Sequence, residues 1–182
     1  DSFFNELNID KPHINLKVKS GSQSTQTSKI MIRYEEILKR KKPSLCLVVG
    51  DVNSTMACAI TAKKMNIKVA HVEAGLRSND NSMPEEINRI VTDSITDYFF
   101  TTSRYANDNL IKLGFNKKNI HFVGNTMIDT LKSSIQSIVE PQFYKKLDLE
   151  RKKYFLMTLH RPSNVDDKKK LSALLKNLSK LV

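Results

Sequence analysis

The sequence predicts an α/β fold in which a parallel β-sheet is covered by helices on both faces. Two observations lead to this prediction. Short, continuously apolar segments alternate along the chain with longer segments whose apolar residues recur at helical spacing. Strands that are apolar throughout are typical of parallel sheets, because such sheets are buried on both faces. With 40% apolar residues, the 182-residue chain has enough apolar material for a core.

The expected elements follow one another in order along most of the chain. The helix over 23–40 has apolar residues at helical spacing, and Pro43 ends it. The helix over 53–66 begins with Asn, Ser and Thr and continues rich in alanine. The helix over 83–97 opens with Pro84 and two glutamates, as the helix dipole favours. The other expected elements are strands over 45–51, 67–75, 98–103 and 120–126, and helices over 104–114 and 127–138.

The alternation of strands and helices is interrupted by a charged, proline-containing segment, which we expect to be a linker over 141–153. It separates a Rossmann-like domain over 1–140 from the start of a second domain over 154–182. Within the second domain, 154–160 (YFLMTLH) predicts a strand and 166–182 a helix. One strand and one helix cannot bury their own faces, so we expect the second domain to continue beyond this chain.

The formal net charge of +11 suggests nucleic-acid binding, because basic surfaces bind phosphate backbones. The distribution of the charges argues against it. The basic clusters at 39–42, 151–153 and 168–170 lie at expected helix ends, a strand approach or a helix start, without interleaved aromatic residues. We therefore expect a solvated, Lys-rich surface and no nucleic-acid partner. No apolar run approaches the roughly 20 residues of a membrane-spanning helix, so we expect no membrane partner either.

The cysteines and the first residues bear on the cellular compartment. Cys46 lies in an apolar run and Cys58 in an Ala-rich helix, as expected for free thiols in a reducing compartment. The chain shows no signal peptide and begins without Met, so we expect the true N-terminus to lie upstream. Together these features predict a cytoplasmic protein.

Polar residues follow every predicted strand. In chain order they are Gly50 and Asp51; His71, Glu73 and Gly75; Thr101, Thr102 and Ser103; Gly124, Asn125 and Thr126; and Thr158, His160 and Arg161. The carboxyl ends of parallel strands meet at one sheet edge, where ligands of open α/β sheets bind. We therefore expect Asp51, Glu73 and Ser103 to lie together at this edge. Glu85 would lie nearby at a helix start, and His160 would face them from the second domain.

Each of these candidates also has a structural explanation. Asp51 is suited to capping the helix that follows it, and Glu85 suits the dipole at its own helix start. An isolated histidine such as His160 is more often a hydrogen-bonded structural residue than a catalytic one. Glu73 is harder to explain in this way, because a structural glutamate between a buried strand and a glycine-containing loop needs a partner. Arg77 is the candidate partner.

Taken together, three carboxylates and a histidine suit proton transfer at carbon, which needs an acid and a base. Carboxylates could also hold Mg²⁺, but the chain has no DxD or HxH cluster, which weakens this alternative. The sequence contains no GxGxxG fingerprint and no P-loop, so neither a dinucleotide site nor a Walker-type phosphate site is indicated. A serine or cysteine nucleophile with a neighbouring base is not evident.

Five blocks of the sequence resemble the non-hydrolysing UDP-N-acetylglucosamine 2-epimerases, in the same order and at the same separations. They are VVGDVNST, HVEAGLRS, MPEEINRIVTD, FVGNTMIDTL and TLHRPSNVDD, and the resemblance covers nearly the whole chain. It implies a glycosyltransferase-B-type architecture of two Rossmann-like domains with the active site in the cleft between them. Relative to that pattern the chain is incomplete at both ends. It lacks the first strand with its G-T-R-P-E loop and most of the second domain. Val52 stands where the family usually has Thr.

The resemblance also implies a reaction. The C2 proton of UDP-N-acetylglucosamine is removed and UDP leaves, which gives a 2-acetamidoglucal. UDP then adds back with reprotonation on the opposite face, which gives UDP-N-acetylmannosamine and supplies N-acetylmannosamine for surface polysaccharide. The family requires neither NAD nor a metal. The implied partners are UDP-N-acetylglucosamine, UDP and a second copy of the full-length protein in a homodimer.

Matched by motif, the resemblance assigns roles to individual residues. Asp51, Glu73 and Glu85 fall on the carboxylates implicated in proton transfer, and which of them removes the proton stays open. His160 falls on a histidine that contacts the substrate diphosphate and is needed for turnover. Arg161 follows it in the same block. Asp51, Glu73, His160 and Arg161 are therefore the expected substrate-binding residues.

Other functions remain alternatives at this stage. A hydrolysing 2-epimerase would release N-acetylmannosamine and UDP, although the HVEAGLRS and HRPSNVDD blocks favour the non-hydrolysing branch. A glycosyltransferase of the same architecture would require an acceptor. A catalytically inactive nucleotide-sugar-binding domain would bind the ligand without proton exchange at C2. We also expect the 182 residues alone to be inactive, because half of the cleft is missing.

Overall fold

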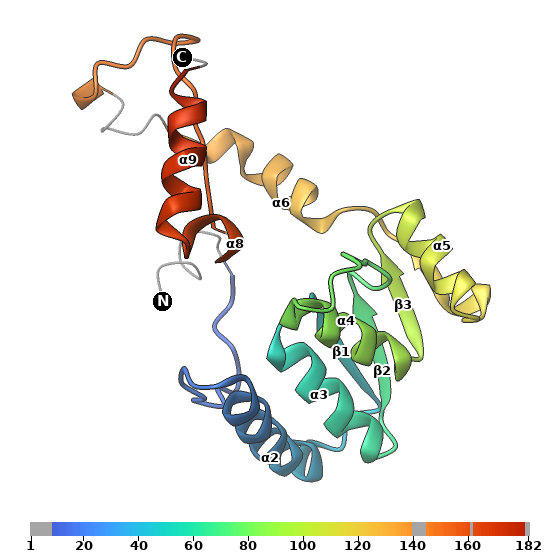
Figure 1. The fold of residues 1–182 in the computed structure, drawn as a ribbon. Helices are drawn as coiled ribbons and strands as arrows, with labels where there is room; N and C mark the ends of the chain where they lie inside the picture. Colours follow the sequence, from blue (N-terminus) through green and yellow to red (C-terminus); the bar gives the residue numbers. More distant parts are fainter. Residues whose placement is uncertain (1–8, 140–144, 161, 181–182) are drawn as a thin grey trace. The chain divides into compact units, whose positions relative to one another are not determined.

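The structure is a computed structural model that describes residues 9–139, 145–160 and 162–180 (Figure 1). The chain folds as two compact units, Asp1–Ser137 and Ile138–Val182. The first unit contains the β-sheet and most of the helices. The second contains short helical segments only, in the part of it that the structure describes.

The first unit is built on a four-stranded sheet in which every strand pair is parallel. The strands lie in the order β1-β2-β3-β4, which is also their order in the sequence. Their bounds are β1 Leu45–Val49, β2 Lys68–Val72, β3 Tyr98–Thr101 and β4 Ile120–Phe122. Each lies within one of the four predicted strand segments, so the predicted α/β class with a parallel sheet is confirmed.

The helices of the first unit also lie close to their predicted positions. They are α2 Gln23–Lys41, α3 Asn53–Lys64, α4 Pro84–Ser94, α5 Arg104–Lys112 and α6 Thr126–Ser134, with single 3₁₀ turns at Lys117–Asn119 and Ile135–Ser137. Local signals set their ends. Ser22 caps α2 by accepting a hydrogen bond from the Thr25 N–H, and Lys42 closes it in the left-handed conformation (φ 46°). Pro84 is the first residue of α4.

The expectation that helices cover both faces of the sheet is wrong for the described residues. One row of the sheet pairs Val48 with His71, His71 with Phe99 and Phe99 with Ile120, so these side chains share a face. Val48 packs in a cluster with residues of α3, and Phe99 packs on Leu110 of α5. The helices α2, α3, α4 and α5 therefore lie on one face. The cause is the strand order, because right-handed crossovers between successive neighbouring strands all pass on the same side.

The opposite face of β1 is exposed accordingly. Leu45, Leu47 and Val49 are 43%, 57% and 52% exposed, while Cys46 and Val48 between them are buried. This alternation shows one buried face and one open face, although the strand is apolar throughout. The apolar run in the sequence could not distinguish a strand buried on both faces from a strand buried on one face.

The core consists of two clusters on the helix-covered face. The first joins α2, α3, β1 and β2 through Leu38, Cys46, Val48, Ala59, Ala62, Ile67 and Val69. Alanines in α3 let this helix lie close to the sheet. The second cluster joins Ala74, Phe99 and Leu110, with Phe115 and Ile120 packed against it. The second cluster includes Ala74, so the loop that follows β2 is itself part of the core.

Cys46 and Cys58 are free thiols, as the sequence predicts. Cys46 is buried beside the Tyr34 hydroxyl, at 3.2 Å from its oxygen. Burial raises the pKa of the Cys58 thiol to about 12, so it stays protonated and unreactive at neutral pH. None of the helices that the structure describes has the length and apolar character needed to cross a bilayer.

The strand expected over 154–160 is absent from the structure. These residues have no regular secondary structure, and Phe155 and Leu156 are 82% and 89% exposed. A strand needs a hydrogen-bonded neighbour, and the described part of the second unit supplies none. The expected helix does form as α9 Lys168–Leu178, capped by the Asp167 carboxylate, after a short α8 Pro162–Val165.

Gly75, in the loop after β2, is in a position that excludes a side chain. Its φ is +78°, which L residues rarely adopt. A Cβ at this position would lie 2.5 Å from the Ala106 carbonyl oxygen and 2.9 Å from Cγ of Leu110. Ala106 and Leu110 belong to α5, so Gly75 is the point at which this loop packs directly on a helix backbone.

We expect Gly75→Ala to lower the free energy of unfolding by about 2–4 kcal/mol, from strain and overpacking together. Gly114→Ala is the matched control, because Gly114 has a φ of +87° but nothing within 4 Å of its Cβ position. The control should lose only about 1 kcal/mol, the backbone strain alone. Urea unfolding followed by circular dichroism measures both values. Equal losses in the two variants would contradict the packing argument.

Candidate functional site

Two of the predicted site residues lie at the carboxyl edge of neighbouring strands. Asp51 follows β1 and Glu73 follows β2. The Gly50 N–H donates to the Val72 carbonyl at 3.0 Å, which ties the two strand ends together. Oε2 of Glu73 lies 3.9 Å from the position that a Cβ on Gly50 would occupy. The carboxylate of Glu73 therefore lies next to the backbone that carries Asp51.

Asp51 does not cap the following helix, so this structural explanation is wrong. The N-cap of α3 is Val52, without a side-chain cap hydrogen bond. Instead, Oδ2 of Asp51 pairs with Nη2 of Arg89 at 2.6 Å. The Asp51 carbonyl accepts a second bond from the Asn88 amide at 2.8 Å. Both partners come from α4, so α4 fixes the position of Asp51.

Arg89 joins Asp51 to a second carboxylate, that of Glu86. Nη1 of Arg89 donates to Oε2 of Glu86 at 2.7 Å. The Glu86 side chain is buried, and its two oxygens also accept the backbone N–H groups of Ser78 (2.9 Å) and Asn79 (3.2 Å). Burial by itself would raise the pKa of Glu86, but the Ser78 N–H and the Arg89 guanidinium outweigh it and hold the pKa at about 2. Glu86 is therefore an ionised anchor for the loop over 76–82.

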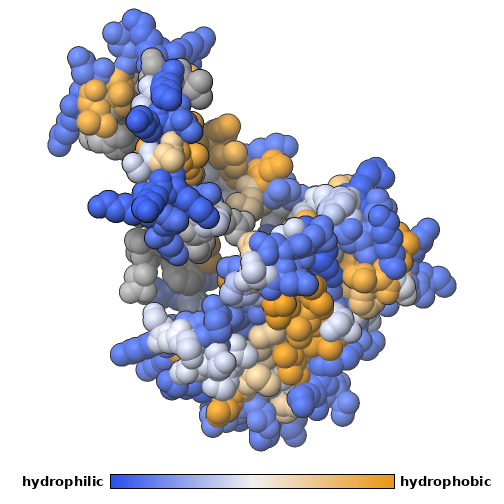
Figure 2. Space-filling model, viewed as in Figure 1, coloured by the Kyte–Doolittle hydropathy of each residue, from blue (hydrophilic) through white to orange (hydrophobic). Residues whose placement is uncertain are grey.

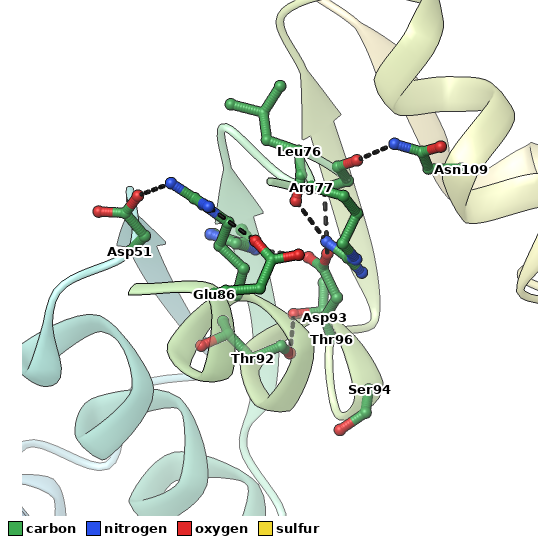
Figure 3. Close-up of polar contacts among 12 residues, drawn as sticks. Asp51, Leu76, Arg77, Glu86, Thr92, Asp93, Ser94, Thr96 and Asn109 are labelled. Atoms are coloured by element: carbon green, nitrogen blue, oxygen red, sulfur yellow. Dashed lines mark hydrogen bonds and ion pairs between the residues drawn. The ribbon is translucent and has the colours of Figure 1, made fainter. Parts of the chain in front are cut away.

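Glu73 lacks the partner that the sequence suggested. Its carboxylate makes no hydrogen bond or ion pair with any residue in the described ranges. Arg77 instead donates to Oδ2 of Asp93 at 2.7 Å and to the Leu76 carbonyl at 2.6 Å (Figure 3). Glu73 is half-buried, and its φ of +71° is unusual for a residue with a side chain. Among the described residues, no side chain or backbone group pairs with the Glu73 carboxylate.

Glu85 lies in the first turn of α4, next to Glu86 but in different surroundings. Like Glu73, it makes no hydrogen bond or ion pair with a described residue. It lines a cavity of about 450 Å³ formed by the segment 15–18 and the starts of α2, α3 and α4. A chain of amides borders the same cavity: Asn88 donates to Asn53 at 3.3 Å and Asn53 donates to Gln26 at 2.9 Å. Glu85 lies on the same helix as Asn88 and Arg89, the two residues that hold Asp51.

The remaining predicted residues have different fates. Ser103 caps α5, because its hydroxyl accepts the Ala106 N–H at 3.1 Å. His160 is exposed in the second unit, and Arg161 lies outside the described residues. That His160 faces the carboxylates therefore stays a prediction. Among the residues that the structure describes, no group of three or more His, Cys, Asp or Glu side chains is arranged to hold a metal ion.

A buried polar cluster below the Glu73 loop was missed by the sequence reasoning. Asp93 of α4 is 1% exposed and accepts three hydrogen bonds (Figure 3). The donors are Nδ1 of His71 (2.8 Å), the Gly75 N–H (3.1 Å) and Nη1 of Arg77 (2.7 Å). The spacing of Glu86, Arg89 and Asp93 places them along one side of α4. This helical spacing of charged residues was the sequence signal that could have predicted the buried polar cluster.

Comparisons with known proteins identify the family. The family model for UDP-N-acetylglucosamine 2-epimerase matches residues 1–182. The chain is 41% identical to the UDP-N-acetylglucosamine 2-epimerase of Methanococcus maripaludis over 98% of its own length and 50% of that protein. It is 38% identical to a UDP-2,3-diacetamido-2,3-dideoxy-D-glucuronate 2-epimerase of Pseudomonas aeruginosa, over 98% of the chain and 50% of that protein.

A solved structure agrees with this result. The UDP-N-acetylglucosamine 2-epimerase of Methanocaldococcus jannaschii, crystallised with UDP-N-acetylglucosamine and UDP, matches with a TM-score of 0.85 and 40% identity. The match covers 98% of this chain and 49% of that one. A parallel α/β domain with carboxylates at its carboxyl edge defines a class of ligand-binding α/β proteins. Within that class, this chain belongs to the UDP-N-acetylglucosamine 2-epimerase family, whose members have a glycosyltransferase-B-like fold. It spans about half the length of these relatives.

Replacing Glu86 by glutamine should destabilise the domain in a pH-dependent way. The folded-state pKa of about 2 lies below the ordinary value of 4.5, so the stabilising contribution is complete above pH 4.5. It is lost as the pH falls towards 2. At pH 7 we expect a loss on the order of 2–4 kcal/mol, from the size of that shift. Urea unfolding at several pH values should show the wild type and Glu86→Gln converging in acid.

Glu85→Gln, one residue earlier, is the control for this prediction. Because Glu85 has no partner among the described residues and interacts only with the dipole of α4, its replacement should change the unfolding free energy by at most about 1 kcal/mol. The difference in unfolding free energy between wild type and Glu86→Gln should shrink between pH 7 and pH 3. If this difference stays constant over that range, the depressed pKa of Glu86 is not its cause.

Proposed function

We propose that the complete protein containing this chain is a non-hydrolysing UDP-N-acetylglucosamine 2-epimerase. A base removes the C2 proton, and UDP leaves from C1 to give a 2-acetamidoglucal. UDP then adds back to C1 while C2 takes a proton on the opposite face, which gives UDP-N-acetylmannosamine. Every substrate atom except the exchanged C2 hydrogen is retained in the product. The product would supply N-acetylmannosamine for surface polysaccharide.

The observation that carries this proposal is the state of Glu73. Its carboxylate lies at the carboxyl edge of the sheet beside Gly50, free of partners among the described residues. A carboxylate that is half-buried and unpaired is available to exchange a proton with a substrate carbon. Glu85 is likewise unpaired, whereas Asp51 is held by Arg89. We assign Glu73 and Glu85 to proton transfer, and Asp51 to proton transfer or to the binding of substrate.

His160 and Arg161 complete the proposed site by binding the substrate diphosphate. This assignment rests on the TLHRPSNVDD block and on the family membership. A cationic side chain stabilises the negative charge that develops on UDP as it leaves. The same histidine would hold UDP in place between elimination and addition. Neither role requires a metal or NAD.

We expect the full-length protein to incorporate deuterium at C2 when it acts on UDP-N-acetylglucosamine in D₂O, with UDP-N-acetylmannosamine as the product. Glu73→Gln and Glu85→Gln should each lower the rate by about 10²–10⁴-fold, the usual value of a general acid or base. NMR of the C2 and anomeric signals follows exchange and product together. UDP affinity, measured by calorimetry, should change little in either variant.

The same measurement separates the alternatives. Free N-acetylmannosamine in place of its UDP derivative would establish a hydrolysing enzyme. Ligand binding without C2 exchange would leave an inactive binding domain, or a transferase that needs an acceptor. If proton exchange occurs only with UDP-2,3-diacetamido-2,3-dideoxy-D-glucuronate, the substrate is the one named for the Pseudomonas aeruginosa relative and not UDP-N-acetylglucosamine. The 182-residue chain, assayed alone, should show no turnover, because it spans half the length of its relatives.

We further propose that the full-length protein is a cytoplasmic homodimer. The two free cysteines support a reducing compartment. The outward side of α4 supports a dimer, because Ile87 and Ile90 are 44% and 40% exposed. Figure 2 shows this apolar surface over α4. A second copy would remove it from water.

Ile87→Glu should convert the dimer to a monomer, because the charge would be buried in an apolar interface. Sedimentation equilibrium at micromolar concentration tests this prediction. A wild-type protein that is already monomeric under these conditions would refute the dimer. Dissociation that leaves the circular dichroism spectrum unchanged would show that the substitution acts at the interface and not on the fold.

A further inference from the structure

We propose that Asp93 is a positioning residue for Glu73. Its buried carboxylate bonds to the His71 side chain before Glu73 and to the Gly75 backbone N–H after it, and these two contacts hold the loop that directs the free carboxylate. The inference rests on the proposed role of Glu73 in proton transfer. It explains why the Asp93 carboxylate is buried, although Asp93 has no role in the proposed reaction itself.

The clamp brackets Glu73 in the sequence. Asp93 accepts hydrogen bonds from His71, two residues before Glu73, and from the Gly75 N–H, two residues after it. Its third donor is Arg77, whose guanidinium is 10% exposed. One carboxylate from α4 therefore holds three points of a seven-residue segment. Burying a charge is costly unless it is paired, and these three bonds satisfy that requirement.

Glu73 needs such a clamp because nothing else described holds its side chain. The residue has a φ of +71°, a conformation that persists only where the surroundings over-determine it. Its N–H and that of Ala74 both donate to the Phe100 carbonyl, at 3.0 and 3.2 Å. These bonds fix the start of the loop only. The Asp93 bonds fix the part beyond the strained residue.

His71 extends the clamp to the loop that carries Asp51. Its side chain is fully buried, and Nε2 lies 2.9 Å from the Gly50 carbonyl oxygen. Both partners of the ring, the Gly50 carbonyl oxygen and the Asp93 carboxylate, are hydrogen-bond acceptors. The same ring therefore ties the end of β1 to α4.

The far side of the loop is closed by α5. Asn109 donates to the Gly75 carbonyl at 2.9 Å, while the Gly75 N–H bonds to Asp93. Gly75 is thus held from both directions, between α4 and α5. A misplacement of a catalytic group by about 1 Å can cost about 10²-fold in rate.

Asp93→Asn is the test, and Asp97→Asn is its matched control. Like Asp93, Asp97 accepts a backbone N–H, here that of Val69 in β2 at 2.8 Å, and pairs with a cation, Lys63 at 2.6 Å. It does so at the opposite, amino end of the strand. Each variant neutralises a carboxylate that pairs with a cation and accepts a backbone N–H, Asp93 beyond the carboxyl end of β2 and Asp97 near its amino end. Only Asp93→Asn should affect the Glu73 loop.

The first readout, amide hydrogen exchange in the full-length protein, does not depend on catalysis. We expect Asp93→Asn to raise exchange in a peptide over 72–79 by at least about tenfold, because protection follows local opening. Asp97→Asn should raise exchange near Val69 instead. Unchanged protection over 72–79 in a folded Asp93→Asn variant would overturn the clamp, whatever the activity. If this variant does not fold, Arg77→Gln removes one donor, and the same comparison applies to it.

The second readout is steady-state kinetics. Asp93→Asn should lower kcat by about 10²-fold and leave KM within about threefold, because positioning of a proton-transfer group acts on turnover more than on binding. Asp97→Asn should change neither. A loosened loop with an unchanged kcat would overturn the positioning role. A wild-type protein that shows no proton exchange at the sugar C2 would refute the proposed function. The amide hydrogen exchange of the loop over 72–79 would still decide whether the clamp exists.

Discussion

The burial of the polar side of α4 against the carboxyl edge of the sheet is the interaction on which the site depends. Glu86 and Asp93 are each 1% exposed, whereas Ile87 and Ile90 on the same helix face outward. This is the reverse of an ordinary amphipathic helix. It is stable because every buried carboxylate has cationic and backbone donors within hydrogen-bond distance. Through Arg89 and Asp93, α4 fixes the loops after β1 and β2.

Sheet topology makes this arrangement possible. Strands that follow one another in sequence and in space bring the ends of β1 and β2 together, and their right-handed crossovers put α3 and α4 on one face. The start of α4 then lies at the carboxyl edge. Glu85 and Glu86 are neighbours in the chain, yet one is buried and paired and the other borders a cavity. Because successive residues of a helix point in different directions, Glu86 is a structural carboxylate and Glu85 is a proposed catalytic one, although both are glutamates.

Local sequence patterns correctly predicted most strands and helices of the first unit, but they failed to predict the structure of the second unit fully. Continuous apolar runs located β1 to β4, because burial on the helix-covered face requires apolar side chains. The same pattern at 154–160 failed, since a strand also needs a neighbour with which to pair. It likewise failed to show that Leu47 and Val49 face outward. Apolar composition reports the preference of a segment for burial, and the rest of the fold decides whether burial occurs.

The sequence by itself determined the order of strands and helices and the placement of Asp51 and Glu73 at one edge, because parallel strands present their carboxyl ends together. Only the tertiary structure decided which charges are paired. Arg77 pairs with Asp93, 16 residues away, and Arg89 with Asp51, 38 residues away. Ion pairs depend on distances in space that periodicity does not encode. Glu73 is therefore left unpaired among the described residues by packing that no local pattern could reveal.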